Sequence, residues 1–99
     1  MTPLEHAAQL IEPIRAAAES CGYAVGIHGS LQRDIDLIAV PWIEKAKHPD
    51  VLFQVILALT RGTAHPPRTR PHGRIVRIIE LEPNVYIDLS IFPRKGNHD

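Results

Sequence analysis

Aspartates interrupt two apolar stretches of this 99-residue chain, "DIDLIAV" and "VYIDLSIF". Residues two apart on a strand share a face, so Asp34 and Asp36 should point to one side and Ile35 to the other. Asp88 breaks the second stretch in the same way. Because a buried carboxylate without a partner is costly or takes up a proton, these acids must meet solvent or a cation. The pattern therefore predicts carboxylates gathered on one face of a sheet.

Three converging carboxylates have the chemistry of a divalent-cation site. Acidic groups at close range repel one another unless a cation lies between them, and oxygen ligands suit Mg²⁺ or Mn²⁺. Divalent ions held in this way serve phosphoryl transfer. We therefore predict that Asp34, Asp36 and Asp88 are metal ligands with a catalytic role.

Residues 61–77 form a basic segment that could face these acids. The segment contains five arginines and no acidic residue: Arg61, Arg68, Arg70, Arg74 and Arg77. Arginine binds phosphate through paired N–H donors, so the segment is suited to a triphosphate or a nucleic-acid backbone. A solvated loop without a ligand is an equally open interpretation of the same residues.

Periodicity and turn signals predict the elements that would position these residues. Two helices are expected, over residues 2–20 and 49–61. Four strands are expected, over residues 23–28, 34–40, 74–82 and 85–92. Pro13 should kink the first helix or divide it in two. The turns "GSLQR" and Pro83-Asn84 suit hairpins, whereas the proline-rich residues 63–73 should form a loop without a packed element.

The order of these elements predicts the fold class. Helix, strand, strand, helix, strand, strand gives an α/β (α+β) two-layer domain with a mixed, mostly antiparallel sheet of about four strands. The length allows a single domain, residues 1–99. The polar residues 93–99 are expected to fray.

Composition indicates an ordinary globular protein, since 44% of the residues are hydrophobic and 22% are charged. The N-terminal stretch is too polar to span a membrane and lacks a signal-peptide pattern. Cys21 is the single cysteine, so no disulfide forms within the chain, which fits a reducing compartment. We therefore expect a cytoplasmic protein without membrane contact. The zero formal net charge and the apolar residues 51–59 favour a homodimer or a protein partner.

The chain places Gly29 and Ser30 in a turn after a strand. The next strand carries Asp34-Ile35-Asp36, and a later strand carries Asp88. This arrangement resembles the nucleotidyltransferase fold of the DNA polymerase beta superfamily. The resemblance spans residues 23–91 and is greatest for small stand-alone members, including those of bacteriophages and the antitoxin halves of toxin–antitoxin pairs.

The resemblance implies an activity and a set of ligands. In this family, NMP is transferred from an NTP to an acceptor, three acids hold two metal ions, and the Gly-Ser turn holds the triphosphate. Mg²⁺ or Mn²⁺ is therefore the expected cofactor, and an NTP and an unknown protein or nucleic-acid acceptor are the expected partners. The predicted nucleotide- and phosphate-binding residues are Gly29, Ser30, Arg33, Arg70 and Arg74.

Two other functions remain open. A non-catalytic member of the same fold would bind a nucleotide or a protein, as an antitoxin-like or phage-encoded effector. The short spacing favours this function, because only three residues separate Ser30 from Asp34 and leave no room for a helix whose N-terminus would bind phosphate. The third function is an interaction module without a ligand, with the apolar residues 51–59 as its oligomerisation surface.

Overall fold

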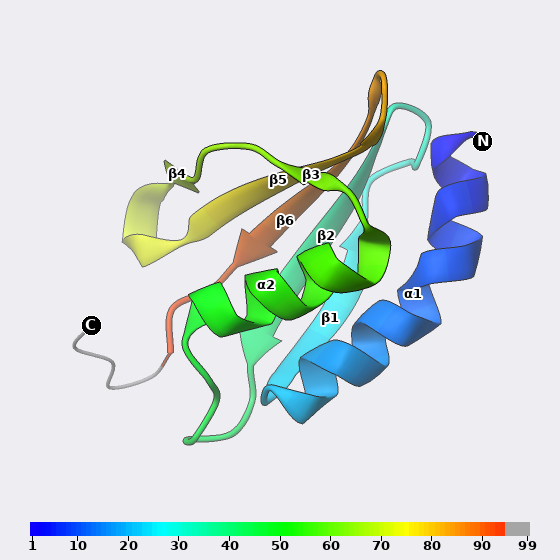
Figure 1. Ribbon diagram of the computed structural model, residues 1–99. Coiled ribbons are helices and arrows are strands. Elements are labelled where there is room, and N and C mark those ends of the chain that lie inside the picture. Colours follow the sequence, from blue (N-terminus) through cyan, green and yellow to red (C-terminus); the bar gives the residue numbers. More distant parts are fainter. Residues whose placement is uncertain (95–99) are drawn as a thin grey trace.

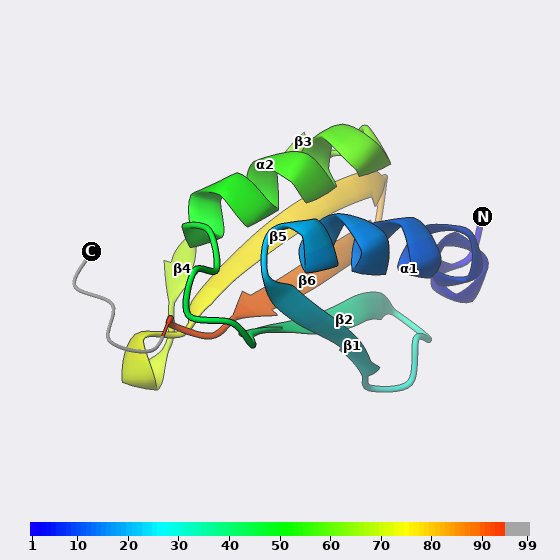
Figure 2. The same ribbon diagram turned by 90° about the horizontal axis from the view of Figure 1, so that it is seen from below.

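The computed structural model of the chain describes residues 1–94, so most of the predicted frayed tail, residues 93–99, lies outside the described part. The elements follow in the order α1 (Pro3–Ser20), β1 (Tyr23–His28), β2 (Asp34–Pro41), α2 (Pro49–Thr60), β3 (Thr63–Ala64), β4 (Arg68–Thr69), a 3₁₀ turn (Pro71–Gly73), β5 (Ile75–Glu82) and β6 (Val85–Ile91). Figure 1 shows both helices packed beside one twisted sheet. Figure 2 shows that they lie on the same side of it. We call the helix-free side of the sheet the open face.

The sheet is mixed, as the sequence predicts. Its strands are ordered β1-β2-β6-β5-β3, and β4 also pairs with β5. β2 and β6 run parallel, whereas the other pairs are antiparallel, including the two predicted hairpins β1–β2 and β5–β6. The parallel pair brings the two aspartate-bearing strands, far apart in sequence, side by side at the centre of the sheet.

The predicted number of strands is wrong, because the sheet has six strands and not about four. β3 and β4 lie within residues 63–73, for which the sequence pattern predicts a loop without a packed element. Each is two residues long and pairs with β5 through its backbone. Such pairing needs no apolar side chain, and Pro66 and Pro67 fall between the two strands, where no ladder hydrogen bond is lost.

The first helix begins as its sequence predicts. Thr2 accepts a hydrogen bond from the Glu5 backbone N–H, and the Glu5 carboxylate accepts one from the Thr2 N–H, which closes a capping box. Pro13 lies inside α1, yet the helix continues over 18 residues instead of dividing in two. Its course bends in Figure 1, as expected where a proline removes an internal hydrogen bond.

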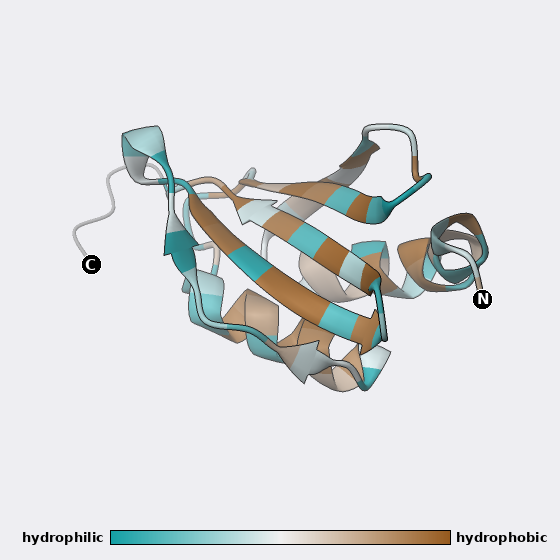
Figure 3. Ribbon diagram, turned by 90° about the horizontal axis from the view of Figure 1, so that it is seen from above, coloured by the Kyte–Doolittle hydropathy of each residue, from teal (hydrophilic) through white to brown (hydrophobic). Residues whose placement is uncertain are grey.

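Side chains of the central strands alternate between the two faces of the sheet. The helix-side residues join α2 in one buried core: Ile35, Leu37, Ile79, Ile87 and Leu89 with Leu52, Phe53 and Ile56. Residues of the opposite parity, including Asp34, Asp36 and Asp88, therefore lie on the open face. Figure 3 shows this alternation as hydrophobic and hydrophilic bands along the strands.

The second helix is buried on one side only, although its residues are apolar nearly all round. Val51, Val55 and Leu59 are 37–43% exposed on its outer side. Within residues 1–94, no helix is both long enough and apolar enough to cross a membrane.

Candidate functional site

Asp36 and Asp88 lie side by side at the centre of the open face. The parallel register of β2 and β6 pairs Asp36 with Asp88 and places Asp34 one pleat further along, opposite Tyr86. On the other side of β2, His28 of β1 pairs with Asp36. Since directly paired residues share a face, the three predicted acids and one imidazole gather on the same side of the sheet.

The three acids interact electrostatically. The pKa of Asp88 is raised above its ordinary value, first by partial burial and then by the negative charges of Asp36 and Asp34. Arg70 and His28 act in the opposite direction without reversing this rise in pKa. The open face therefore holds negative charge that its own basic groups leave uncompensated, and a bound cation would relieve the repulsion.

The strand register bears on the predicted metal site through one pair of carboxylates. Among the residues that the structure describes, no group of three or more His, Cys, Asp or Glu side chains is arranged to hold a metal ion. The set of three metal ligands therefore stays a prediction. Asp36 and Asp88 are the directly paired carboxylates, and Mg²⁺ is commonly bound by one or two carboxylates while water and substrate phosphates complete its coordination.

Gly29 allows the Asp36 carboxylate to close against the turn before β2. Its φ is +82°, and a Cβ at this position would lie 2.8 Å from Oδ2 of Asp36. The hydroxyl of Ser30 accepts a hydrogen bond of 3.4 Å from the backbone N–H of Gln32, which tightens the turn. The predicted Gly-Ser turn thus lies directly beside one of the paired acids, and the positive φ favours glycine there.

The turn and the acids enclose a first hollow. It has a volume of about 340 Å³ and is lined by Ser30, Gln32, Arg33, Asp34 and Asp36. Two of the predicted phosphate-binding residues, Ser30 and Arg33, are therefore adjacent to two of the predicted metal ligands.

The arginines of residues 61–77 lie on different sides of the molecule. Arg70 is close enough to Asp88 to lower its pKa. The guanidinium of Arg74 lies 5.9 Å from the centre of the Phe92 ring, beyond the end of β6. Arg77 lies on the helix side, where it contacts α2. The segment is therefore not one continuous basic surface, and among these three Arg70 has the clearest electrostatic link to the acids.

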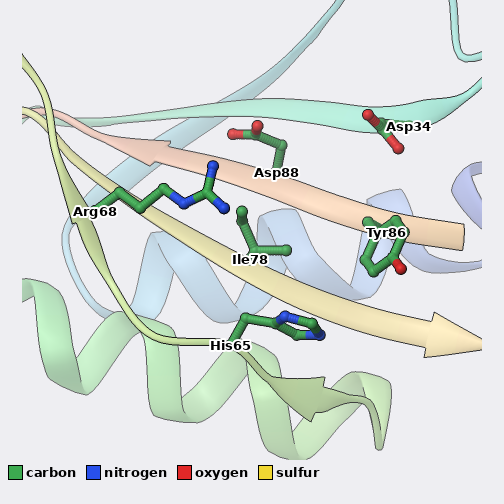
Figure 4. A pocket seen from close by; sticks show the side chains of 6 residues that line it. All are labelled: Asp34, His65, Arg68, Ile78, Tyr86 and Asp88. Carbon is green, nitrogen blue, oxygen red and sulfur yellow. The ribbon is translucent and has the colours of Figure 1, made fainter. Parts of the chain in front are cut away.

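A second hollow lies across the open face from the turn (Figure 4). It also has a volume of about 340 Å³ and is lined by Asp34, His65, Arg68, Ile78, Tyr86 and Asp88. Sequence analysis does not identify His65 or Tyr86 as site residues, and it names Arg68 only as one of the arginines of the basic segment. The spacing of Tyr86 two residues before Asp88 is a signal for it, since both must share a strand face. His65 carries no such signal, and the place of Arg68 in this hollow is not evident from the sequence, because both belong to a segment whose pairing with β5 the pattern does not predict.

Comparison with protein-family models finds no match for this chain, and no curated protein matches it either.

Proposed function

We propose that the chain is a metal-dependent nucleotidyltransferase that transfers NMP from an NTP to an acceptor. The observation that carries this proposal is the direct pairing of Asp36 with Asp88 on the open face, with the Gly29 turn against one carboxylate. Phosphoryl transfer depends mainly on positioning and on neutralising phosphate charge. The paired acids, the tight turn and the nearby arginines supply these elements.

The residues around the paired acids have separate roles in this proposal. Asp36 and Asp88 hold Mg²⁺ or Mn²⁺, and Asp34 completes the acidic group from the next position along β2. The cation, when bound, neutralises charge on the phosphates and on the leaving group. Ser30 and Arg33 bind the phosphates from the turn side, and Arg70 binds them from the opposite side.

The transfer itself requires one proton acceptor. The hydroxyl oxygen of the acceptor attacks the α-phosphorus, and the bond between this phosphorus and the oxygen bridging to the β-phosphate breaks. Pyrophosphate leaves, and the hydroxyl proton goes to the carboxylate of Asp88. Asp88 is the candidate acceptor of this proton because it lies beside Asp36 at the centre of the open face.

A second function is favoured by a different observation. No group of three acids is arranged to hold a metal ion among residues 1–94. A non-catalytic member of the same fold would bind a nucleotide or a protein without this arrangement. The two functions differ in whether the NTP is consumed.

A labelling experiment separates the two functions. The protein is incubated with Mn²⁺ and each α-labelled NTP, alone and with a cell extract, and label is sought on protein and on RNA. The enzyme should transfer label, and Asp36→Asn should abolish transfer because it removes the charge that holds the cation. Asp50→Asn is the matched control, since it makes the same change at the start of α2, where Asp50 contacts Arg77 on the helix side of the sheet and not the open face.

The outcomes are distinct. Transfer that Asp36→Asn abolishes and Asp50→Asn preserves supports the enzyme. Retained nucleotide without transfer supports the non-catalytic binder. Equal transfer in wild type and Asp36→Asn would assign the activity to a contaminant and remove the acids from the mechanism.

A further inference from the structure

The hollow in Figure 4 has the size and lining of a small organic ligand site. Its volume of about 340 Å³ is near the lower end of ligand pockets, which suits a nucleoside better than a folded polymer. Ile78 lies near its middle, with Asp88 and Arg68 at one end and the rings of His65 and Tyr86 toward the other, where Asp34 is the strand partner of Tyr86. One end of the hollow therefore pairs a guanidinium with a carboxylate, and the other combines two rings with a second carboxylate.

The aromatic end is a corner made of two rings. The centroids of His65 and Tyr86 are 5.8 Å apart, and the ring planes meet at 85°. The side chain of Ile78 adds an apolar surface beside them. A flat heteroaromatic group entering this corner would stack on one ring and meet the edge of the other, an arrangement that aromatic groups prefer.

The imidazole of His65 is oriented by its neighbour. Nε2 of His65 lies 3.1 Å from Oε1 of Glu80, and the Glu80 side chain is only 31% exposed. A carboxylate only accepts hydrogen bonds, so Nε2 of His65 donates to Glu80. This hydrogen bond holds the ring beside Tyr86.

The charged end faces the proposed reaction centre. The guanidinium of Arg68 points toward Asp88 and Ile78 in Figure 4, and Asp88 is paired with Asp36 on the neighbouring strand. A nucleotide whose base occupied the aromatic corner would therefore place its phosphates between Arg68 and the paired acids. The two ends of the hollow match the two ends of a nucleotide.

We propose that this hollow binds the base and ribose of the NTP, with Tyr86 and His65 as the stacking surface and Arg68 directing the phosphates toward Asp88. This inference rests on the proposed function and adds the place where the nucleoside binds. It predicts affinity for a nucleoside that carries no phosphate and needs no metal ion.

Ligand-observed and protein NMR titrations test the nucleoside site. Adenosine is titrated without metal, and inorganic tripolyphosphate is titrated with Mg²⁺. Tyr86→Leu removes the aromatic surface but keeps apolar bulk, and it should weaken adenosine binding about fivefold or more. Tyr86→Phe should bind adenosine as the wild type does, and tripolyphosphate binding should be the same in all three proteins.

Two further variants complete the test. His65→Ala changes the connection between β3 and β4, which contributes nothing to the buried core, and it should also weaken adenosine binding. Trp42→Leu is the matched control, since Trp42 is 64% exposed and does not line the hollow. It should leave adenosine binding unchanged.

The nucleoside site and the transfer reaction can be contradicted independently of each other. If adenosine does not bind, or binds Tyr86→Leu and His65→Ala as tightly as wild type, the nucleoside site is wrong even where NMP transfer is observed. If adenosine binding depends on Tyr86 and His65 but no NTP yields transfer, the nucleoside site stands and the nucleotidyltransferase falls.

Discussion

The two faces of the sheet are made of the same strands but obey different physical requirements. On the helix side, Ile79, Ile87 and Leu89 are fully buried, and no aspartate of β2 or β6 lies among them. On the open face, Asp36 and Asp88 sit side by side. Burial fixes the first face because apolar contacts there hold the helices, whereas the second face can carry charges whose repulsion a packed core would not tolerate.

Two arginines of the basic segment show the same contrast. Arg77, on the helix side, lies 3.7 Å above the Phe53 ring and 3.3 Å from a carboxylate oxygen of Asp50, and its side chain is 13% exposed. Arg68, on the open face, is exposed and lines the hollow beside Asp88. One guanidinium therefore joins a helix to the sheet, and the other is accessible to a phosphate.

The largest expected difference between the faces is in the free energy of unfolding. Ile79 and Ile78 are neighbours on β5 with opposite directions; Ile79 is 0% exposed in the core, whereas Ile78 is half-buried on the open face. Ile79→Ala should lower the free energy of unfolding by about 2–5 kcal/mol, because it leaves a cavity. Ile78→Ala should lower it by about 1 kcal/mol or less.

Urea unfolding followed by circular dichroism measures both variants. The comparison is sharp because the two changes remove the same atoms from adjacent residues of one strand. Equal losses of stability would mean that the open face is packed as tightly as the helix side, and the contrast between the faces would be wrong.

The sequence predicts the elements of this contrast better than it predicts the site. The alternation in "DIDLIAV" and "VYIDLSIF" already assigns the acids and the aliphatic residues to opposite faces. It does not reveal that β2 and β6 are neighbours, because their pairing joins residues about 50 apart, and nothing local specifies a long-range register. The face to which an arginine of β5 points is equally hidden, because β5 carries aliphatic residues on both faces, Ile79 on one and Ile78 on the other.

The second hollow is beyond sequence reasoning for a related reason. His65 and Arg68 reach it through β3 and β4, two-residue strands whose stability comes from backbone pairing to β5. Backbone hydrogen bonds have no side-chain signature, so a polar, proline-rich segment is naturally interpreted as a loop. The nucleoside site could therefore be proposed only once the segment was seen to lie along the sheet.

The second prediction compares Gly26, in β1, with Gly29, in the turn that follows it. Gly29→Ala should lower the free energy of unfolding by about 1–2 kcal/mol, because a residue with a Cβ is strained at a φ of +82°. The added Cβ also meets Oδ2 of Asp36 at 2.8 Å and must displace this carboxylate. Gly29→Ala should therefore also show a smaller Mg²⁺-induced rise in Tm than the wild type.

Gly26→Ala, in β1 three residues before Gly29, is the matched control. A Cβ there meets no atom within 4 Å, so the variant should be as stable as wild type or slightly more stable. Thermal melts with and without Mg²⁺ measure both quantities. If Gly29→Ala kept the full Mg²⁺-induced shift in Tm, Asp36 would not be a metal ligand.

The smallest expected effect is a rise in Tm when Asp88 is replaced. The pKa of Asp88 is higher in the folded chain than its ordinary value of 3.8, because of burial and the charges of Asp36 and Asp34, which Arg70 and His28 only partly offset. The folded state therefore binds the proton of the Asp88 carboxyl more tightly than the unfolded state does. As a result, the free energy of unfolding falls as pH rises from about the ordinary pKa of Asp88 through its raised pKa. Above that window the ionised carboxylate is a constant cost.

Asp88→Asn should consequently raise Tm at pH 7 in the presence of a chelator, and the gain should shrink as pH is lowered through the raised pKa. Glu82→Gln is a control of opposite sign, because the hydrogen bond from His6 lowers the pKa of Glu82. The Glu82 carboxylate therefore stabilises the fold above its ordinary pKa of 4.5, and this stabilisation is lost as pH falls through its lowered pKa. Adding Mg²⁺ should reverse the order for Asp88, because a cation bound only by the folded wild type stabilises it by mass action. A variant that is less stable than wild type in chelator would show that Asp88 contributes to the fold, and the open face would then share the structural role of the helix side.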